Sequence, residues 1–178
     1  MANTYHHLGN AHFELSNLKE AKEHYDRALE IQLRNVGPDH VYTAFSYCSL
    51  GDVQRELGSL VKAKEHYERS LGIRLEKLGP EHVEVAISHN NLGIIHRYMG
   101  DLQKAKKHHE LALDIERKKR GPDHVYVANT YYHLGNVQYD LRNLREAKMH
   151  YKRALNIQLE KLGPDHVNVA FSYCSLGY

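Results

Sequence analysis

Apolar and polar positions along this chain follow the period of an α-helix, and the whole pattern returns every 42 residues. Within residues 38–57, apolar side chains recur every three or four positions, which predicts a helix with one buried face. A second helical stretch follows at 60–78, after a short polar turn. No single pair of such helices can bury its apolar face, so a repeat of this length predicts an array of stacked helix pairs. The units run over 2–43, 44–85, 86–127, 128–169 and a partial fifth, 170–178.

The turns between the expected helices carry residues that end one helix and start the next. Residues 37–41, Gly-Pro-Asp-His-Val, recur in every unit with Asp or Glu in third place, and the glycine and proline stop the preceding helix. Because proline and an acidic residue suit a helix N-terminus, we expect the first helix of the second unit to begin near Pro38. Glutamates three positions after Asn17 and Asn143 predict reciprocal capping hydrogen bonds. The expected N-caps of the second helices are Asn17, Ser59, Asp101 and Asn143.

Small residues at two positions of the repeat predict close packing and tight turns. Gly9 and its equivalents are expected where the two helices of a unit cross closely, against Ala21 and Ala28. Glycine also precedes the N-cap in two units, where it eases a left-handed turn. Ser16 and Arg142 take that place in the other two units, so we expect strain or a different turn at both.

The repeated residues resemble a known repeat family. The pattern Tyr-x-x-Leu-Gly, then Ala-x-x-x-Tyr-x-x-Ala-Leu-x-Ile, then Leu-Gly-Pro-Asp-His-Val-x-Val-Ala is similar to the tetratricopeptide repeat in its 42-residue form. That form resembles the arrays of kinesin light chains, nephrocystin-type proteins and nucleotide-switch immune receptors. The resemblance implies an all-α fold, a right-handed α-solenoid superhelix of stacked antiparallel helix pairs. It also implies a non-catalytic scaffold that binds a peptide or a partner helix in a concave groove lined by the first helices.

The expected groove surface is the face of each first helix that lies opposite its packing face. Aromatic side chains there would anchor ligand side chains, while asparagine and arginine would hold peptide carbonyls and carboxylates. Two other functions stay open: self-association through the apolar terminal repeats into a homo-oligomer, and a ligand-sensing segment of a larger nucleotide-switch receptor. The predicted binding residues are Asn3, His6, Asn10, Phe13, Cys48, Asp52, Arg55, Asn90, Ile94, Arg97, Tyr98, Tyr132, Asn136 and Tyr139.

Composition and charge narrow the function further. The formal charge is +2 and both signs are interleaved, which makes nucleic acid a poor candidate partner. No apolar run is long enough to cross a membrane, and no leader segment opens the sequence. Because neither a phosphate-binding loop nor a nucleophile with its base can be assembled, we expect no catalysis and no cofactor. Two cysteines make no disulfide framework, which favours a reducing, cytoplasmic compartment.

Histidines and one basic run supply the remaining candidate chemistry. Eight of the 15 histidines fall in two repeat columns, which indicates a structural role. In the third unit, His89 and His109 replace two tyrosines, and they would form a weak metal site or an acid-sensitive pair if they faced each other. The second helix of that unit ends in a basic run, which either complements the helix dipole or docks an acidic partner. The run is Arg117, Lys118, Lys119 and Arg120.

Overall fold

The computed structural model describes residues 1–177, and within that range it contains nine α-helices and no strand. The helices belong to two compact parts, residues 1–80 and residues 81–178. Tyr178, the last residue of the predicted partial unit, lies outside the described residues. The first part comprises α1 (Ala2–Glu14), α2 (Leu18–Asn35), α3 (Val41–Glu56) and α4 (Leu60–Leu78). The second part comprises α5 (Val83–Tyr98), α6 (Leu102–Arg120), α7 (Val125–Asp140), α8 (Leu144–Leu162) and α9 (Val167–Leu176).

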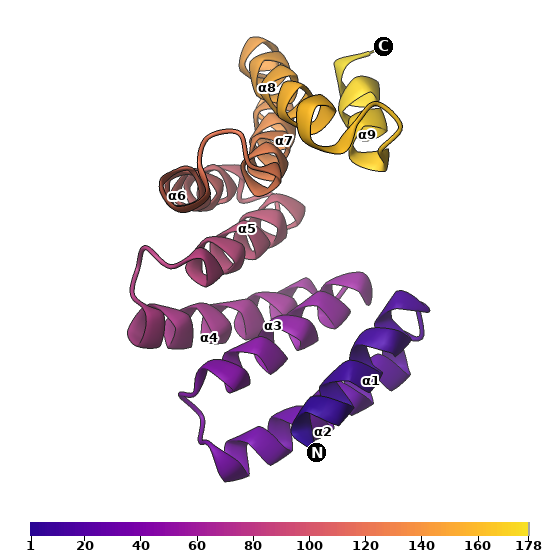
Figure 1. Ribbon diagram of the computed structural model, residues 1–178, viewed down its shortest axis with the longest axis vertical. Helices are drawn as coiled ribbons and strands as arrows, with labels where there is room; N and C mark the ends of the chain where they lie inside the picture. Colours follow the sequence, from indigo (N-terminus) through magenta and orange to yellow (C-terminus); the bar gives the residue numbers. More distant parts are fainter. Residues whose placement is uncertain (178) are drawn as a thin grey trace. The chain divides into compact units, whose positions relative to one another are not determined.

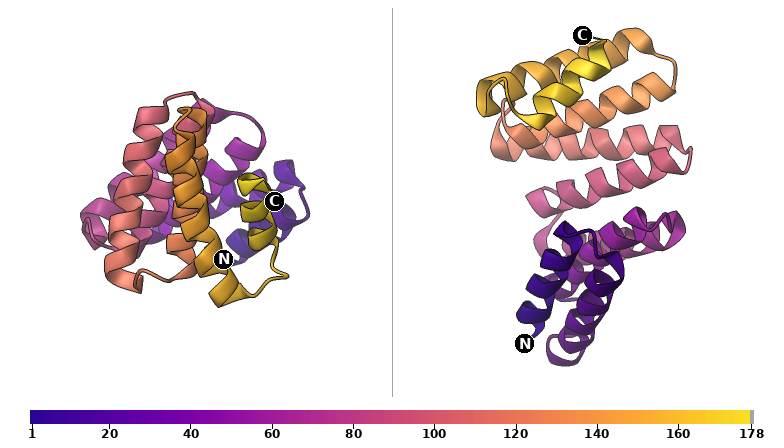
Figure 2. Two further views of the ribbon diagram at one scale, coloured as in Figure 1. Left: turned by 90° about the horizontal axis from the view of Figure 1, so that it is seen from above. Right: turned by 90° about the vertical axis from the view of Figure 1, so that its right-hand side faces the viewer.

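Successive helices form pairs joined by short turns (Figure 1). In the first part α1 packs on α2 and α3 packs on α4, while α2 also packs on α3. In the second part α5 pairs with α6 and α7 pairs with α8, while α6 packs on α7 and α8 packs on α9. The right-hand view of Figure 2 shows the α5–α6 and α7–α8 pairs lying along one another. Each part therefore consists of stacked helix pairs, as the repeat predicts.

The two helices of a pair meet where a ring of the second helix lies on a glycine of the first. A Cβ atom added to Gly9 would lie 2.5 Å from Cε1 of Tyr25, and one added to Gly93 would lie 2.5 Å from Cε1 of His109. The sequence placed Gly9 against alanines, whereas the structure places the Tyr25 ring there. Only glycine leaves room for the ring, because real Cβ atoms do not come this close to neighbouring atoms. The contact recurs in every complete unit.

The first helices begin later than the sequence predicted, because histidine and not proline marks their start. His40 is the N-cap of α3, which begins at Val41 and not at Pro38. Its Nδ1 atom accepts a hydrogen bond from the backbone N–H of Tyr42 at 3.2 Å. This bond gives one histidine column the structural role that its periodicity indicated. The same N-cap bond occurs at His82, His124 and His166.

The second helices begin where the sequence predicted, but the capping boxes do not form. Asn17, Ser59, Asp101 and Asn143 are the N-cap residues of α2, α4, α6 and α8, and none makes a side-chain cap hydrogen bond. Their ψ angles of 61 to 68° lie outside the extended region that directs a capping side chain toward the helix. Asn143 instead donates from Nδ2 to Oε1 of Gln138 at 2.9 Å.

The turn before each of these N-caps is left-handed in all four units. Ser16 and Arg142 have φ angles of 60° and 64°, and Gly58 and Gly100 have φ angles of 74° and 83°. Ser16 and Arg142 therefore adopt the same left-handed turn as the two glycines, and not a different turn. In a residue with a Cβ atom, this conformation lowers the stability of the fold by about 1 kcal/mol or more.

We expect Arg142→Gly to raise the free energy of unfolding by about 1 kcal/mol, because glycine adopts the left-handed turn without steric cost. Urea unfolding followed by circular dichroism measures the change. Gly100→Ala is the reverse substitution at the equivalent position and should lower stability by a similar amount. Equal stability of Arg142→Gly and the parent chain would contradict the assignment of strain to this turn.

Candidate functional site

Tyrosines of the second helices donate hydrogen bonds to polar residues of the first helices. The pairs and their O···O distances are Tyr25–Asn10, 2.8 Å; Tyr67–Asp52, 2.7 Å; and Tyr151–Asn136, 2.9 Å. Burial is the main cause that raises the pKa of Tyr25 and that of Tyr151 to about 12 each. Three predicted groove residues therefore hold a helix pair together, and their side chains are partly occupied before any ligand arrives.

The third unit replaces this pair with a different polar network. Ile94 stands in place of the hydrogen-bond acceptor, and His109 stands in place of the tyrosine. His109 turns instead to Asn90, whose Oδ1 lies 2.9 Å from its Nδ1. The Asn90 amide donates to Glu116 at 3.1 Å and to Thr130 at 2.7 Å, and the Thr130 hydroxyl donates to Glu116 at 2.7 Å. Asn90, which the sequence placed in the groove, is thus the centre of an internal network.

The network fixes the proton positions on its members. Because the Asn90 nitrogen faces the Glu116 carboxylate, its carbonyl oxygen faces His109, which then donates from Nδ1. The Nε2 atom of His109 is left as a buried acceptor with no hydrogen-bond partner among the described residues. Burial, followed by the nearby His133, lowers the pKa of His109 well below its ordinary value. His109 is therefore neutral near pH 7.

Glu116 is a buried acid that forms no ion pair with any side chain in residues 1–177. It is 1% exposed, and burial raises its pKa to about 7 against the opposing effects of the Thr130 hydrogen bond and the Arg120 charge. At neutral pH the carboxyl group is therefore near the midpoint of its titration. The equivalent residues in the first and fourth units are Gln32 and Gln158, which carry no charge.

The histidines of the third unit do not pair as the sequence suggested. Nδ1 of His89 lies 3.0 Å from Nδ1 of His108, and His109 lies beside Asn90. Burial, with the neighbouring His89 next in effect, lowers the pKa of His108 to about 4. Among residues 1–177 no group of three or more His, Cys, Asp or Glu side chains is arranged to hold a metal ion.

An open hollow of about 350 Å³ lies on the first helices of the second part. Arg97 on α5 donates from Nε to Oδ2 of Asp140 on α7 at 2.6 Å, so its guanidinium is held at the edge of this hollow. Tyr98 is 55% exposed and Phe171 is 57% exposed. Five predicted groove residues are brought together here. The lining residues are Ile94, Arg97, Tyr98, His109, Tyr132, His133, Asn136 and Phe171.

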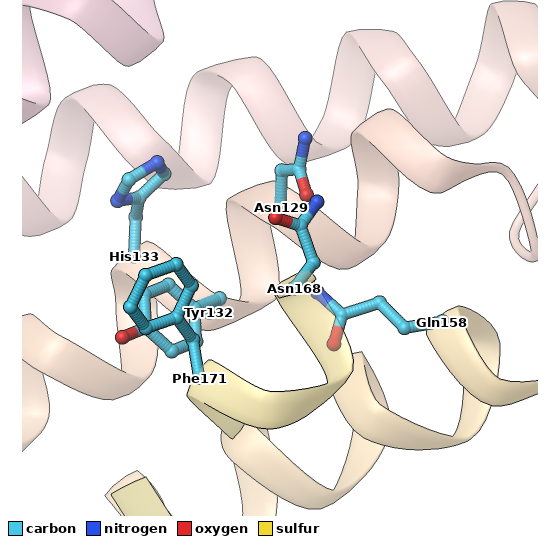
Figure 3. A pocket seen from close by; sticks show the side chains of 6 residues that line it. All are labelled: Asn129, Tyr132, His133, Gln158, Asn168 and Phe171. Carbon is cyan, nitrogen blue, oxygen red and sulfur yellow. The ribbon is translucent and has the colours of Figure 1, made fainter. Parts of the chain in front are cut away.

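A second hollow of about 220 Å³ shares three of these residues (Figure 3). It combines the aromatic side chains of Tyr132 and Phe171 with three amide side chains from α7, α8 and α9. Gln158 is 2% exposed, and its Oε1 accepts a hydrogen bond from Ser172 at 2.7 Å. The lining residues are Asn129, Tyr132, His133, Gln158, Asn168 and Phe171.

Sequence reasoning missed several of these lining residues, although one signal was available. Phe171 occupies the same repeat column as Asn3, and Asn129 lies in that column as well. Because residues 170–178 form only a partial unit in the sequence, the repeat pattern does not indicate that α9 lines a hollow. Gln158 and His109 lie on second helices, and the wheel of the first helices could not identify them.

The predicted residues of the first part are mostly engaged in internal contacts. Nε2 of His6 lies 3.1 Å from Oγ of Ser49, and Arg55 forms an ion pair with Glu56 at 2.9 Å. Phe13 is half-buried and packs against the buried cluster that includes Tyr25 and Leu50. Asn3 is exposed and Cys48 is half-buried.

Three of the side-chain contacts between successive first helices share one spacing. The pair His6 and Ser49, the pair Arg97 and Asp140, and the pair Tyr132 and Ser175 are each 43 residues apart. This spacing is one repeat plus one residue.

Tyr139, another predicted groove residue, lies on the same helix as Tyr132 and is 52% exposed.

We expect Glu116→Gln to make the protein more stable than the parent at high pH. The folded-state pKa of about 7 lies above the ordinary 4.5, so the ionised carboxylate destabilises the fold progressively as pH rises through this window. The advantage of the variant should therefore grow by about 1 to 3 kcal/mol between pH 5 and pH 8. Urea unfolding of both proteins at the two pH values measures it. Parallel pH dependences would show that Glu116 titrates normally.

Comparisons with known proteins agree with this architecture. The tetratricopeptide repeat model matches residues 1–76, 55–118, 84–160 and 126–178, while no curated protein sequence matches the chain. BtubC (BKLC) from P. vanneervenii is 26% identical with a TM-score of 0.82, and the match covers 96% of this chain and 68% of that one. A putative kinesin light chain from Podosopora anserina with nearly identical TPR-like repeats is 21% identical, with a TM-score of 0.81 and coverage of 98% and 82%.

RapI in its apo form is 21% identical, with a TM-score of 0.79, and the match covers 89% of this chain and 56% of that one. These similarities and the stacked helix pairs show an all-α fold of the α-solenoid class. No helix within residues 1–177 has the length and apolar character that a membrane span requires. Because the family model matches across the sequence, the chain belongs to the tetratricopeptide repeat family.

Proposed function

We propose that the chain is a protein interaction module that holds a peptide segment of a partner in the two adjoining hollows around Tyr132. Tetratricopeptide repeats generally mediate protein–protein interaction on a non-catalytic scaffold. The observation that carries the proposal is the gathering of exposed aromatic side chains and amides around two hollows on α5, α7 and α9. The expected compartment stays the cytoplasm.

The aromatic residues give the hollows their affinity for apolar side chains. Tyr132 and Phe171 line both hollows, and Tyr98 lines the first. Exposed aromatic rings lose little conformational entropy when a ligand covers them, and they bury a large apolar area. Because the two hollows adjoin each other at Tyr132 and Phe171, each can hold one of two side chains of the same peptide.

Polar groups on the rim would fix the direction and register of the peptide. Asn129 and Asn168 are half-buried and present amides, which can both donate to peptide carbonyls and accept from peptide N–H groups. Arg97 is positioned by Asp140 through Nε, and the remaining guanidinium N–H groups can donate to a ligand carbonyl or carboxylate. Fixing the side chain before binding lowers the entropic cost of association.

The test uses peptides selected on the intact chain from a random phage-displayed library. A selected peptide is labelled, and fluorescence anisotropy gives its affinity for the parent and for Tyr132→Ala. We expect Tyr132→Ala to weaken binding by about tenfold or more, since a central aromatic residue in an interface contributes on the order of 2 kcal/mol.

Met149→Ala is the matched control, because Met149 is 59% exposed on α8 and lines neither hollow. The affinity of Met149→Ala for the selected peptide should equal that of the parent. Asn90→Ala is not a suitable groove variant, since it disrupts the internal network with Glu116 and Thr130. Selected peptides that bind Tyr132→Ala and Met149→Ala equally well would refute the proposal.

A further inference from the structure

The last turn of α6 differs from the equivalent turns of the other second helices. Arg117 and Arg120 stand where the other units have leucine or valine. Helices α2, α4 and α8 each carry one basic residue in the last turn, whereas α6 carries four. One basic residue in the last turn is therefore enough to complement the dipole of a second helix in this repeat. The three additional basic residues of α6 are not required for that purpose. The apolar residues of the other units are Leu33, Val36, Leu75, Leu78, Leu159 and Leu162.

The two lysines of this turn are weakly held. Lys118 lies 3.3 Å and Lys119 lies 3.8 Å from the carboxylate oxygens of Glu81. The side chains of Lys118 and Glu81 are 63% and 61% exposed, and ion pairs this exposed to solvent contribute little. A ligand carboxylate could therefore replace Glu81 at low cost.

The two arginines hold no carboxylate hydrogen bond among the described residues. The guanidinium of Arg120 lies over the ring of Tyr126, 4.4 Å from its centroid, which orients the group while its N–H donors remain available. Arg117 is exposed on the same turn. Arginine binds carboxylates through two parallel hydrogen bonds, so a pair of neighbouring arginines suits a pair of neighbouring acidic side chains.

Two hollows meet at this turn, on the loop between α6 and α7. Arg120 and Lys161 line the larger one, of about 490 Å³, and Arg117 and Lys118 line the smaller, of about 310 Å³. Pro122 lines both. Neither hollow shares a lining residue with the two hollows around Tyr132.

Acidic side chains at this surface are fewer than the basic ones. Asp114 and Asp123 line the hollows, and Asp123 already accepts a hydrogen bond from Arg153 at 3.1 Å. Lys161 lies 2.7 Å from the neighbouring Glu160. Arg117 and Arg120, the two residues that set this unit apart, form no ion pair within residues 1–177, although the charge of Arg120 also acts on the buried Glu116.

We propose that the basic turn surface, formed by Arg117, Lys118, Lys119, Arg120 and Lys161, is a second docking site that binds an acidic segment of a partner protein. The segment lies across Pro122 and places adjacent aspartate or glutamate side chains on Arg117 and Arg120. This site is separate from the peptide-binding hollows, so the module contacts its partners on two surfaces.

The test measures binding of a fluorescein-labelled poly-glutamate peptide to the intact chain by fluorescence anisotropy at low salt. The variant Arg117→Leu with Arg120→Leu restores the apolar residues that other units carry at these positions, so it is expected to fold. We expect it to weaken binding by about tenfold, since exposed charge pairs contribute modestly and two are removed. Circular dichroism checks the fold.

The matched control is Arg145→Leu with Lys148→Leu, which removes the same charge from exposed positions of α8. The control should bind the peptide as the parent does, and Tyr132→Ala should do so too. Equal weakening in the two double variants, or no binding by the parent, would overturn the proposal. Tighter binding of a single-stranded DNA of equal charge, with the same dependence on Arg117 and Arg120, would also overturn it in favour of a phosphate polymer.

Discussion

The distance between the two helices of every pair depends on one steric contact, in which an aromatic ring of the second helix lies against a glycine of the first. Gly9 and Gly135 are buried beneath the rings of Tyr25 and Tyr151, and an added methyl group would overlap them. The close approach also brings each tyrosine hydroxyl to a polar side chain of the facing helix. The same contact therefore sets the packing distance and decides which polar residues are used internally.

In the third unit several residues around this contact differ together from the other units. When histidine replaces the tyrosine, the ring still fits on Gly93, but it no longer reaches the acceptor position, which is Ile94. His109 bonds to Asn90 instead, and Asn90 bonds to Glu116. The result is a buried carboxyl group with a raised pKa and a neutral histidine, and this histidine lines the hollow that contains Arg97. The proposed binding surface thus borders the interior that departs most from the repeat.

Much of the fold could be predicted from sequence because it rests on periodic features. Apolar spacing placed the helix pairs, and the N-cap positions such as Asn17 and Asn143 were correct. The histidine caps were not foreseen, since proline near a helix start is the stronger general signal and the imidazole acceptor depends on backbone angles at His40. The candidate site was harder to predict. A helical wheel gives the side of a helix, but it does not show that Asn90 turns inward or that Phe171 and Gln158 complete a hollow with Tyr132.

The spacing of 43 residues that three contacts between first helices share has an evolutionary consequence. The two residues of each such pair are separated by one repeat plus one residue, and this separation stays the same when a complete repeat is gained or lost. Recombination between equivalent positions of two repeats therefore preserves these contacts between neighbouring units. Loss or gain of a single residue inside a unit would break that pairing at both adjacent units. Residues 2–51 and 128–177 are near copies of each other, and duplication of a block of whole units or engineering would each produce such a match in this register.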